Sequence, residues 1–510
     1  MIANVKSCAL SGLDGYLVTV EVDAYAGVPA IDIVGLPDAA VKESKERVRS
    51  AVRNSGLQFP QKKIIVNLAP ADTKKEGAYL DLAITTAILI SSGQLEQPCA
   101  DGILFIGELA LDGSLRPANG VLPMVLEAKK CGITHAIVPV ENAREAAVVD
   151  GVEVYSAARL SDVVGHLRGE RKLPRETVDL AAIFHDGGAL HEDFADVKGQ
   201  EGAKRALEVA AAGAHNCLMI GAPGSGKTML ARRLPGILPN LTFDEALEVT
   251  KIYSIAGKLP PGEALIQQRP FRSPHHGISG AALTGGGVNP RPGEICLAHR
   301  GVLFLDEFPE FRKDAMEAMR QPLEDGFFTV ARTGGTVTFP SACMLVASMN
   351  PCRCGYYGDP VRECTCTPGQ IQKYLGKISG PMLDRVDIHI EVPTVQFADL
   401  TQERPAECTA DIKRRVDAAR EIQLKRYQRD GIFANAQLDA AGIEQYCRVG
   451  EDGKAILAQA FQRLGLSARA HARILKVART IADLAGSEQI AVAHLAEAIQ
   501  YRSLDKKFFR

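Results

Sequence analysis

The sequence has little excess charge of either sign. Its 510 residues include 59 lysines and arginines against 61 aspartates and glutamates, which gives a formal net charge of −2. The chain as a whole therefore lacks the positive field that draws many proteins to nucleic acids. Any contact with DNA or RNA must come from local basic elements.

Long apolar runs are also absent. No stretch approaches the roughly 20 residues that span a membrane, and residues 1–6 lack the pattern of a secretory signal peptide. We therefore expect a cytoplasmic protein without membrane contact, in which the 12 cysteines do not form a disulfide framework. The short apolar run at 85–90 is expected to lie in a core helix.

The composition, with 46% hydrophobic and 24% charged residues, is typical of a globular protein, and the length favours about three domains. Short apolar runs that alternate with helical segments predict an α+β domain at the N-terminus. The fold class expected overall is a multidomain combination of α/β and α+β parts. The predicted ranges are an α+β domain at 1–168, a linker at 169–195, an α/β/α core at 196–393 with a Cys-rich insertion at 351–367, and a helical segment at 394–510.

A phosphate-binding pattern stands near the middle of the chain. Residues 221–228 read G-x-x-x-x-G-K-T, between an apolar run and a helical segment. Such a loop points backbone N–H groups at a phosphate, and the following helix N-terminus adds partial positive charge. Lys227 is expected to reach the β- and γ-phosphates of ATP, and the Thr228 hydroxyl to ligate Mg²⁺. The expected nucleotide-binding residues are Gly221, Ala222, Pro223, Gly224, Ser225, Gly226, Lys227 and Thr228.

Two carboxylates follow the apolar run at 302–305. A run of this kind predicts a strand buried between helical layers, and its position about 80 residues after the P-loop is typical of ATP hydrolases. Asp306 is expected to hold Mg²⁺. Glu307 is expected to polarise the water that attacks the γ-phosphate.

Four of the cysteines lie close together in the sequence. Cys352, Cys354, Cys364 and Cys366 offer four thiolates, a set that favours tetrahedral Zn²⁺. The C-x₂-C spacing of common zinc knuckles is absent, so a cysteine-bearing surface loop open to oxidation stays an alternative.

Three further segments have recognisable local patterns. Residues 321–339 predict a β-hairpin with a turn at 332–335. The Gly- and Pro-rich stretch at 269–293 predicts an insertion or a long surface loop rather than a regular helix. Residues 409–428 predict a basic helix, whose charges indicate a solvated face, with nucleic-acid contact as the less favoured alternative.

The N-terminal domain resembles the proteolytic domain of Lon protease. The similarity lies in residues 75–82 and 107–116. The resemblance places the peptidase nucleophile at Tyr79 and its catalytic lysine at Leu122, and neither residue can act in a Ser–Lys dyad. We expect a Lon-like fold without peptidase chemistry that serves as a collar or binding module, and an unrelated α+β domain is the alternative.

Two residues around the P-loop resemble nucleotide contacts of AAA+ ATPases. Residues 196–200 are similar to the segment that precedes the P-loop there, which implies that Val197 contacts the adenine. Asn350 ends the apolar run at 345–349 and matches the sensor 1 position, which implies that it holds the attacking water. A simple asparagine at a strand end is the alternative.

Two arginines resemble AAA+ residues that reach the γ-phosphate. Residues 381–389 are similar to the arginine-finger stretch of MCM helicases and chelatases, which implies that Arg385 enters the ATP site of a neighbouring subunit. A surface arginine paired with Asp384 or Asp387 is the alternative. Ser467-x-Arg469 resembles the sensor 2 helix, in which Arg469 rather than Arg473 is favoured to act in its own subunit.

Taken together, the sequence resembles the ComM/YifB family of magnesium-chelatase-like AAA+ proteins over essentially its whole length. The distinctive stretches are 271–276, 289–294 and 348–352. The resemblance implies a Lon-like domain, an AAA+ ATPase core and a C-terminal helical lid. It also implies a hexameric ring that hydrolyses ATP as a DNA helicase and promotes branch migration when donor DNA is integrated in natural transformation. The predicted hairpin resembles the presensor hairpin of MCM helicases, which implies that Arg332 contacts DNA in the ring pore.

Two other functional classes stay open at this point. One is a chelatase motor subunit that inserts Mg²⁺ into a porphyrin, although such subunits lack a Lon-like domain. The other is a protein remodeller or ATP-dependent peptidase. The missing serine and lysine argue against peptidase chemistry alone, not against protein unfolding or a scaffold role.

Overall fold

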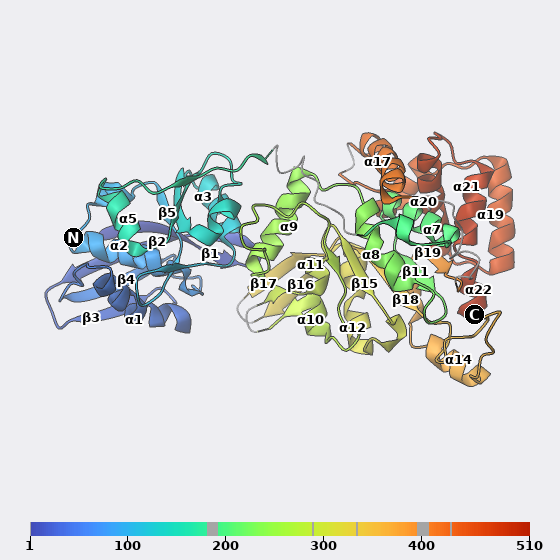
Figure 1. Ribbon diagram of the computed structural model, residues 1–510, viewed down its shortest axis with the longest axis horizontal. Coiled ribbons are helices and arrows are strands. Elements are labelled where there is room, and N and C mark those ends of the chain that lie inside the picture. The colour runs from blue at the N-terminus through green and yellow to red at the C-terminus, as the bar shows by residue number, and fades with distance from the viewer. Residues whose placement is uncertain are drawn as a thin grey trace. The chain divides into compact units, whose positions relative to one another are not determined.

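The structure is a computed structural model that describes residues 2–180, 192–287, 290–332, 335–394, 407–428 and 431–509 (Figure 1). Residues 181–191 of the predicted linker, residues 395–406, Asn289 and the side chain of Arg332 lie outside the described residues. Two compact units form. The first contains the described residues up to 180, Phe243–Gln267 and Ala331–Thr338, and the second contains the remaining described residues. The segment at 243–267, inside the range predicted for the ATPase core, therefore folds with the N-terminal unit.

The N-terminal unit is built on a mixed eight-stranded sheet in the order β10-β9-β8-β5-β1-β2-β4-β3. Its strands are β1 (Ala3–Ser11), β2 (Asp14–Tyr25), β3 (Ala30–Val34), β4 (Lys63–Ala69), β5 (Ile103–Phe105), β8 (His135–Pro139), β9 (Glu153–Ala157) and β10 (Arg175–Glu176). A small pair, β6 (Glu108–Leu109) and β7 (Leu115–Arg116), stands apart from it. Because β10 pairs with β9, the beginning of the predicted linker extends the sheet.

Side chains that alternate along the strands give this sheet two apolar faces. In β1, Val5 and Ala9 belong to one core cluster and Cys8 to the other. The first cluster is completed by α1 (Ala39–Asn54), α2 (Asp81–Ser91) and α5 (Leu160–Leu167), and the second by α3 (Val121–Lys130) and α4 (Ala143–Ala146). Every residue of α2 is buried, which confirms the core helix predicted around 85–90.

A buried ion pair fixes the start of α2. Asp81 Oδ2 accepts hydrogen bonds from Arg47 Nε at 2.7 Å and from the Leu109 backbone N–H at 3.2 Å. Its other oxygen accepts one from Ser44 Oγ at 2.5 Å. Desolvation raises the pKa of Asp81, although Arg47 and Ser44 act in the opposite direction. One carboxylate thereby ties α1, α2 and β6 together.

The second unit contains a parallel five-stranded sheet in the order β12-β15-β18-β11-β19. The strands are β11 (Cys217–Ile220), β12 (Phe271–Arg272), β15 (Val302–Leu305), β18 (Met344–Met349) and β19 (Ile388–Glu391). The three central strands, β15, β18 and β11, are buried along their whole length, as their continuous apolar sequences predict. Because they are parallel neighbours, their carboxyl ends meet at one edge of the sheet.

Helices complete the second unit, and the C-terminal segment is helical as predicted. Helices α17 and α20 pack against α7, and their apolar residues join the core of the parallel sheet. The bounds are α7 (Glu201–Gly213), α8 (Lys227–Ile237), α11 (Glu294–Leu297), α12 (Lys313–Ala318), α15 (Gly380–Leu383), α17 (Thr409–Arg426), α18 (Ala440–Tyr446), α19 (Glu451–Leu464), α20 (Ala468–Leu484), α21 (Val492–Gln500) and α22 (Leu504–Phe508).

The basic residues of α17 are partly engaged within the protein. Arg426 Nη2 lies 2.5 Å from Asp483 Oδ1, and Lys413 Nζ donates to the Leu238 carbonyl at 2.7 Å. Arg415 bonds to the buried carboxylate of Glu208. The prediction of a purely solvated face is therefore wrong for these three side chains, which hold the helix in place.

The hairpin predicted from the sequence is present, with β16 (Phe327–Arg332) paired to β17 (Gly335–Pro340). Its predicted beginning at 321–325 is wrong, since α13 (Arg320–Asp325) occupies those residues and Gly326, at φ 73°, ends the helix. In its described residues, the Gly- and Pro-rich stretch contains, besides β12, only the short elements α10 (Gly280–Thr284), β13 (Gly285–Gly286) and β14 (Arg291–Pro292).

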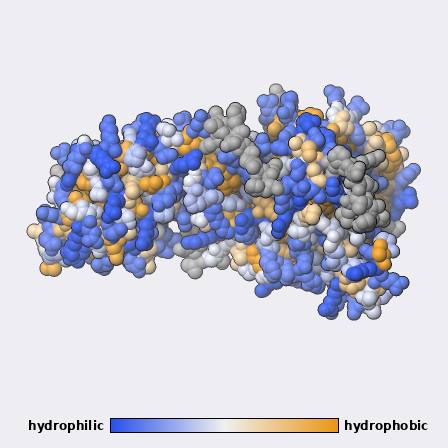
Figure 2. Space-filling view, in the orientation of Figure 1, coloured by the Kyte–Doolittle hydropathy of each residue, from blue (hydrophilic) through white to orange (hydrophobic). Residues whose placement is uncertain are grey.

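No helix in the described ranges has the length and apolar character needed to cross a membrane. On the face shown in Figure 2, hydrophobic residues are scattered among hydrophilic ones.

The ion pair at α2 gives a stability prediction. Asp81→Ala leaves the Arg47 guanidinium half-buried without its carboxylate, so the free energy of unfolding should fall by about 3 kcal/mol. Asp32→Ala is the matched control, because Asp32 lies 3.7 Å from Lys63 and both side chains are exposed. That change should cost less than about 0.5 kcal/mol. Equal urea denaturation curves for the two variants would contradict the role given to Asp81.

Candidate nucleotide site

The loop between β11 and α8 forms a hollow suited to phosphate. Gly226 precedes the helix at φ 92°, a backbone conformation that favours glycine. A Cβ atom placed on Gly224 or Gly226 would meet nothing within 4 Å, so space lies open beside the loop. Ser225 Oγ is buried and has no hydrogen-bond partner among the described residues. An anion in this hollow would provide the missing partner.

Lys227 is the buried cation of the site. Its Nζ donates to the carbonyl oxygens of Gly221 and Ala222 at 2.8 and 2.9 Å, and to Asn350 Oδ1 at 3.2 Å. Burial lowers the pKa of Lys227 to about 8, although nearby Asp306 acts in the opposite direction. The ammonium group thus rests on weak neutral acceptors that a phosphate can replace.

Thr228 and Asp306, the two residues predicted to hold Mg²⁺, are in direct contact. Thr228 Oγ1 donates to Asp306 Oδ2 at 2.9 Å. Ser348, on the neighbouring strand β18, donates to the other carboxylate oxygen. A hydroxyl and a carboxylate side by side are the hard oxygen donors that Mg²⁺ prefers, together with substrate phosphates. The residues present therefore fit the predicted metal.

Glu307 lies beside these groups with its side chain 60% exposed. Its backbone is left-handed, at φ 53°, which is unusual for a residue with a side chain. The carboxylate Oε2 is 3.3 Å from His276 Nδ1, in the Gly- and Pro-rich stretch. The sequence places His276 in a distinctive stretch but does not indicate this contact, because only the fold brings the two side chains together.

Asn350 and the segment before α7 adjoin the P-loop from two sides. The Gly221 N–H donates to the Met349 carbonyl at 3.2 Å, which places Asn350 beside the start of the loop. Gln200 Nε2 donates to the Ser225 carbonyl at 3.3 Å, a contact that the sequence did not indicate. Val197, predicted to contact the adenine, is 5% exposed and belongs to the core cluster of this unit.

In this single chain, Arg385 and Arg469 contact residues outside the P-loop. Arg385 bonds to Glu324 and donates to the Pro381 carbonyl at 2.7 Å. Arg469 Nη1 is 3.6 Å from Asp384, and its side chain is 67% exposed. Among the interactions of the described residues, none joins either arginine to the P-loop.

Arg473, the less favoured sensor candidate, has a packing role instead. It forms an ion pair with Asp387, which is buried and also lies 3.5 Å from His215 Nδ1. Desolvation raises the pKa of Asp387, but Arg473 and His215 outweigh it and hold the pKa well below its usual range. This arginine fastens α20 to the residue that precedes β19.

The four clustered cysteines come together as predicted from their spacing. All four sulfur atoms lie within 4.8 Å of one another. Cys352 Sγ is 3.3 Å from Cys354 Sγ and 3.6 Å from Cys364 Sγ. Tetrahedral zinc with Zn–S bonds of about 2.3 Å separates its sulfurs by about 3.8 Å, so the donor set fits Zn²⁺.

In the N-terminal unit, Tyr79 and Leu122, where the Lon resemblance places the peptidase dyad, are packed side chains. Tyr79 contacts both apolar clusters, and burial raises the pKa of its hydroxyl. Leu122 is fully buried in α3. Neither position offers a nucleophile or a base.

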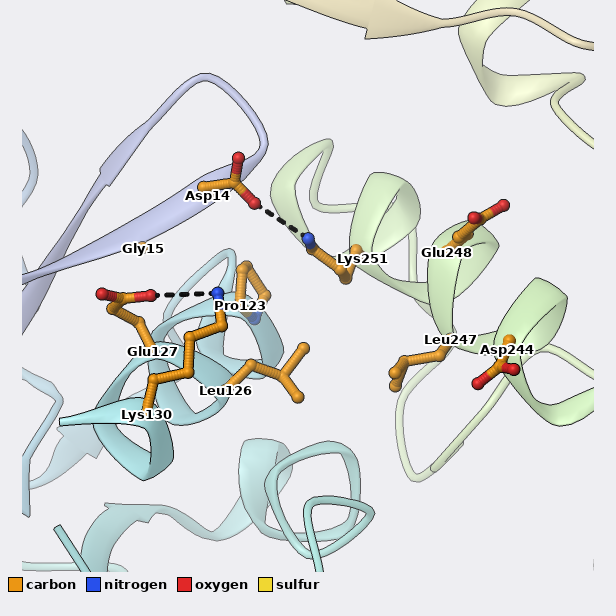
Figure 3. Close-up of a pocket in the computed structure, with 10 residues that line it drawn as sticks. All are labelled: Asp14, Gly15, Pro123, Leu126, Glu127, Lys130, Asp244, Leu247, Glu248 and Lys251. Atoms are coloured by element: carbon orange, nitrogen blue, oxygen red, sulfur yellow. Dashed lines mark hydrogen bonds and ion pairs between the residues drawn. The ribbon is translucent and has the colours of Figure 1, made fainter. Parts of the chain in front are cut away.

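A cavity of about 290 Å³ opens in the same unit, between α3, the β1–β2 turn and α9 (Phe243–Ile255) (Figure 3). Leu126 and Leu247 line it, and Lys251 bonds to Asp14 at 3.0 Å across its edge. None of its lining residues is among the predicted site residues.

Family profiles match most of the chain. The profile described as "Magnesium chelatase, subunit ChlI" matches residues 193–400, and that of its C-terminal region matches 406–502. A third, described as "Subunit ChlI of Mg-chelatase", matches residues 20–142. The three matches include the P-loop, both carboxylates after β15 and the cysteine cluster.

Whole-length relatives are found among curated proteins. The chain is 45% identical over 506 residues to competence protein ComM of Haemophilus influenzae, covering 99% of this chain and 98% of that protein. It is 44% identical over 504 residues to protein YifB of Escherichia coli, covering 98% and 97%. A 174-residue stretch is 26% identical to Lon protease of Rhizobium meliloti, covering 32% of this chain and 21% of the protease, which supports the Lon-like similarity.

The lowered pKa of Lys227 predicts that polyphosphate binding depends on pH. Lys227 is cationic below pH about 8 and neutral above it in the ligand-free protein. Nucleotide affinity should therefore fall about tenfold per pH unit above that point. The arginine of the Lys227→Arg variant stays charged throughout this range. The nucleotide affinity of this variant should therefore not change with pH. Titration calorimetry at a series of pH values measures the nucleotide affinity of the wild type and of the variant. A wild-type affinity that stays constant up to pH about 9.5 would contradict the role of Lys227 in phosphate binding.

Proposed function

The chain belongs to the ComM/YifB family of magnesium-chelatase-like AAA+ proteins, and we propose that it is a cytoplasmic, ATP-driven DNA motor. In this proposal a hexameric ring hydrolyses ATP as a helicase and promotes branch migration when donor DNA is integrated. The observation that carries it is the meeting of Lys227, Thr228, Asp306, Glu307 and Asn350 at one edge of the parallel sheet.

The geometry supports ATP hydrolysis at this edge. Lys227 exchanges the carbonyls of Gly221 and Ala222 for the β- and γ-phosphates, and backbone N–H groups of the loop hold the same oxygens. Thr228 and Asp306 would hold Mg²⁺, which would neutralise charge on the phosphates. Glu307 moves away from His276 and accepts a proton from the attacking water, which Asn350 orients.

Two arginines complete the site in this proposal. Arg385 leaves Glu324 and reaches the γ-phosphate held by a neighbouring subunit, where a planar guanidinium stabilises the charge of the transition state. Among the described residues, the Arg469 side chain is held only by a 3.6 Å ion pair with Asp384, so it is able to swing toward the nucleotide of its own subunit. The C-terminal helices then act as the lid.

The remaining parts support the motor. The β16–β17 hairpin carries Arg332 into the ring pore, where its charge follows the DNA phosphates without reading bases. The Lon-like domain, with Tyr79 and Leu122 packed in place of the dyad, acts as a collar without peptidase activity. The four clustered cysteines bind a structural zinc ion.

A comparison of potential substrates tests the proposal directly. ATP hydrolysis is measured alone and with single-stranded DNA, duplex DNA, a porphyrin or an unfolded protein, and Glu307→Gln reports the background. Single-stranded DNA should stimulate hydrolysis several-fold. Stimulation only by porphyrin would favour a chelatase motor, and stimulation only by unfolded protein would favour a remodeller.

Arg332→Ala tests the hairpin. Basal ATP hydrolysis should be retained, because Arg332 is not one of the residues assigned to nucleotide binding or hydrolysis. DNA binding should weaken, and the slope of log affinity against log salt should shrink by about 1 for each lost phosphate contact. Arg312→Ala, which removes an exposed arginine paired with Asp314, is the control and should leave DNA binding unchanged. Unimpaired unwinding and an unchanged salt slope for Arg332→Ala would remove the hairpin from the DNA path.

Mixed rings test whether Arg385 acts between subunits. Lys227→Ala disables a subunit's own P-loop, and Arg385→Ala disables the site of its neighbour, so each variant alone should be nearly inactive. In a 1:1 mixture about a quarter of the interfaces combine an intact loop with an intact arginine, and hydrolysis should partly return. A mixture no more active than its components would place Arg385 outside the shared site.

A further inference from the structure

The Cys-rich loop, defined as residues 351–367, contacts the nucleotide site directly. It begins immediately after Asn350, whose amide oxygen accepts from Lys227 Nζ. Its turn at Gly355 lies against the P-loop, since a Cβ atom on Gly355 would stand 2.5 Å from Pro223 Cδ and 2.7 Å from Pro223 Cγ. The loop that carries the cysteine cluster therefore packs directly against the P-loop.

The end of the loop returns to the same place. Cys366 is followed by α14 (Pro368–Leu375), which Thr367 caps. In this helix, Tyr374 is almost fully buried, and its hydroxyl lies near the backbone of Asn350. Both ends of the loop thus lie near Asn350, whose side chain contacts Lys227.

A third part of the loop contacts the C-terminus and the end of the sheet. The Tyr357 ring meets the Phe508 ring edge to face, with centroids 6.2 Å apart. Thr394 Oγ1 donates to Asp359 Oδ2 at 3.4 Å. The loop therefore bridges the P-loop, the end of β18 and α22, the last helix of the chain.

Besides the cysteines, turns and short-range hydrogen bonds shape this loop, such as that of Arg362 Nη1 with the Tyr356 hydroxyl at 2.7 Å. Residues 351–367 contain no helix or strand, and Val361 is 84% exposed. Cys352 is buried, while the other three cysteines are partly exposed. A metal ion bound by all four would fix both halves of the loop and remove much of its conformational freedom.

We propose that the Cys-rich loop is a metal-held support of the P-loop, so that zinc and nucleotide strengthen each other's binding. The inference rests on the ATP and zinc sites of the proposed function and adds a coupling between them. Zinc would hold Gly355 against Pro223, and the P-loop would keep the shape that binds phosphate. Thermodynamic linkage then requires nucleotide to tighten zinc binding by the same factor.

Two glycines of the loop offer matched variants that keep all four thiols. Gly355 and Gly358 both have positive φ angles, 91° and 79°, so alanine brings similar backbone strain at each. At Gly355 the new methyl group collides with Pro223. At Gly358 the nearest atom is Lys507 Cε, at 3.8 Å. A difference between the two variants therefore reports the contact with the P-loop.

The experiment measures zinc content, zinc affinity and nucleotide affinity on the full-length protein. Wild-type protein should contain one zinc per chain, and a non-hydrolysable ATP analogue should slow zinc loss to a chelator about five-fold or more. Gly355→Ala should keep its zinc but bind the analogue about five-fold or more weakly, with the linkage lost. Gly358→Ala should resemble the wild type in both respects.

Removal of the metal gives the complementary measurement. Cys364→Ser should lose zinc and bind nucleotide as weakly as Gly355→Ala, and Cys131→Ser, at an exposed thiol outside the cluster, should change neither. Circular dichroism shows whether the Cys364→Ser variant is folded. If this variant is unfolded, the comparison of Gly355→Ala with Gly358→Ala still tests the coupling.

The possible failures are distinct. Reduced wild-type protein with no zinc would overturn the metal site, and wild-type protein that binds no nucleotide would overturn the proposed function. Zinc and nucleotide that bind without affecting each other, with Gly355→Ala equal to Gly358→Ala, would overturn only the coupling.

Discussion

The hydrogen bonds of the Lys227 ammonium group join the two strands on which the site is built. The group bonds to the carbonyls of Gly221 and Ala222 after β11, and to the amide of Asn350 after β18. This meeting requires the parallel register that pairs Ile220 with Met349. A shift of that register would separate the P-loop from Asn350 and from the Cys-rich loop that follows it. The buried charge also needs these acceptors, because desolvation penalises an unpaired ammonium group.

Several functional groups have a partner inside the chain before any ligand binds. Thr228 is bonded to Asp306, Glu307 lies beside His276, and Arg385 is bonded to Glu324. Nucleotide and a neighbouring subunit must replace these partners for the proposed hydrolysis to proceed. These residues of the ligand-free site are thus engaged within the chain, and in the proposed function assembly and nucleotide compete with contacts that already exist. In the proposed ring, such competition would link hydrolysis to assembly.

Much of the site could be predicted because its signals are local. The loop at 221–228, the carboxylates after β15 and Asn350 each end a short apolar run, and parallel strands carry their ends to one edge. The cysteine cluster was visible in its spacing alone. The core helix α2 followed from its apolar run, since burial on all sides leaves no polar face.

The remaining features depend on contacts between distant parts of the chain. His276 meets Glu307 only through the path of an irregular stretch. Residues 243–267 join the N-terminal unit because α9 packs on α3, which no local pattern indicates. The charges on α17 were interpreted as solvated, but Arg415 and Arg426 have buried partners more than 50 residues away in the sequence. Helical periodicity shows which residues share a face, and it does not show what covers that face.

The central claim is that nucleotide replaces the internal partners of the site and that a second subunit completes it. A structure of the assembled protein with Mg²⁺ and a non-hydrolysable ATP analogue tests this most directly. The account predicts Lys227 on the phosphates instead of the Gly221 and Ala222 carbonyls, Glu307 released from His276, and Arg385 of each subunit at the neighbouring γ-phosphate. A nucleotide bound with Lys227, Glu307 and Arg385 still on their internal partners would contradict it.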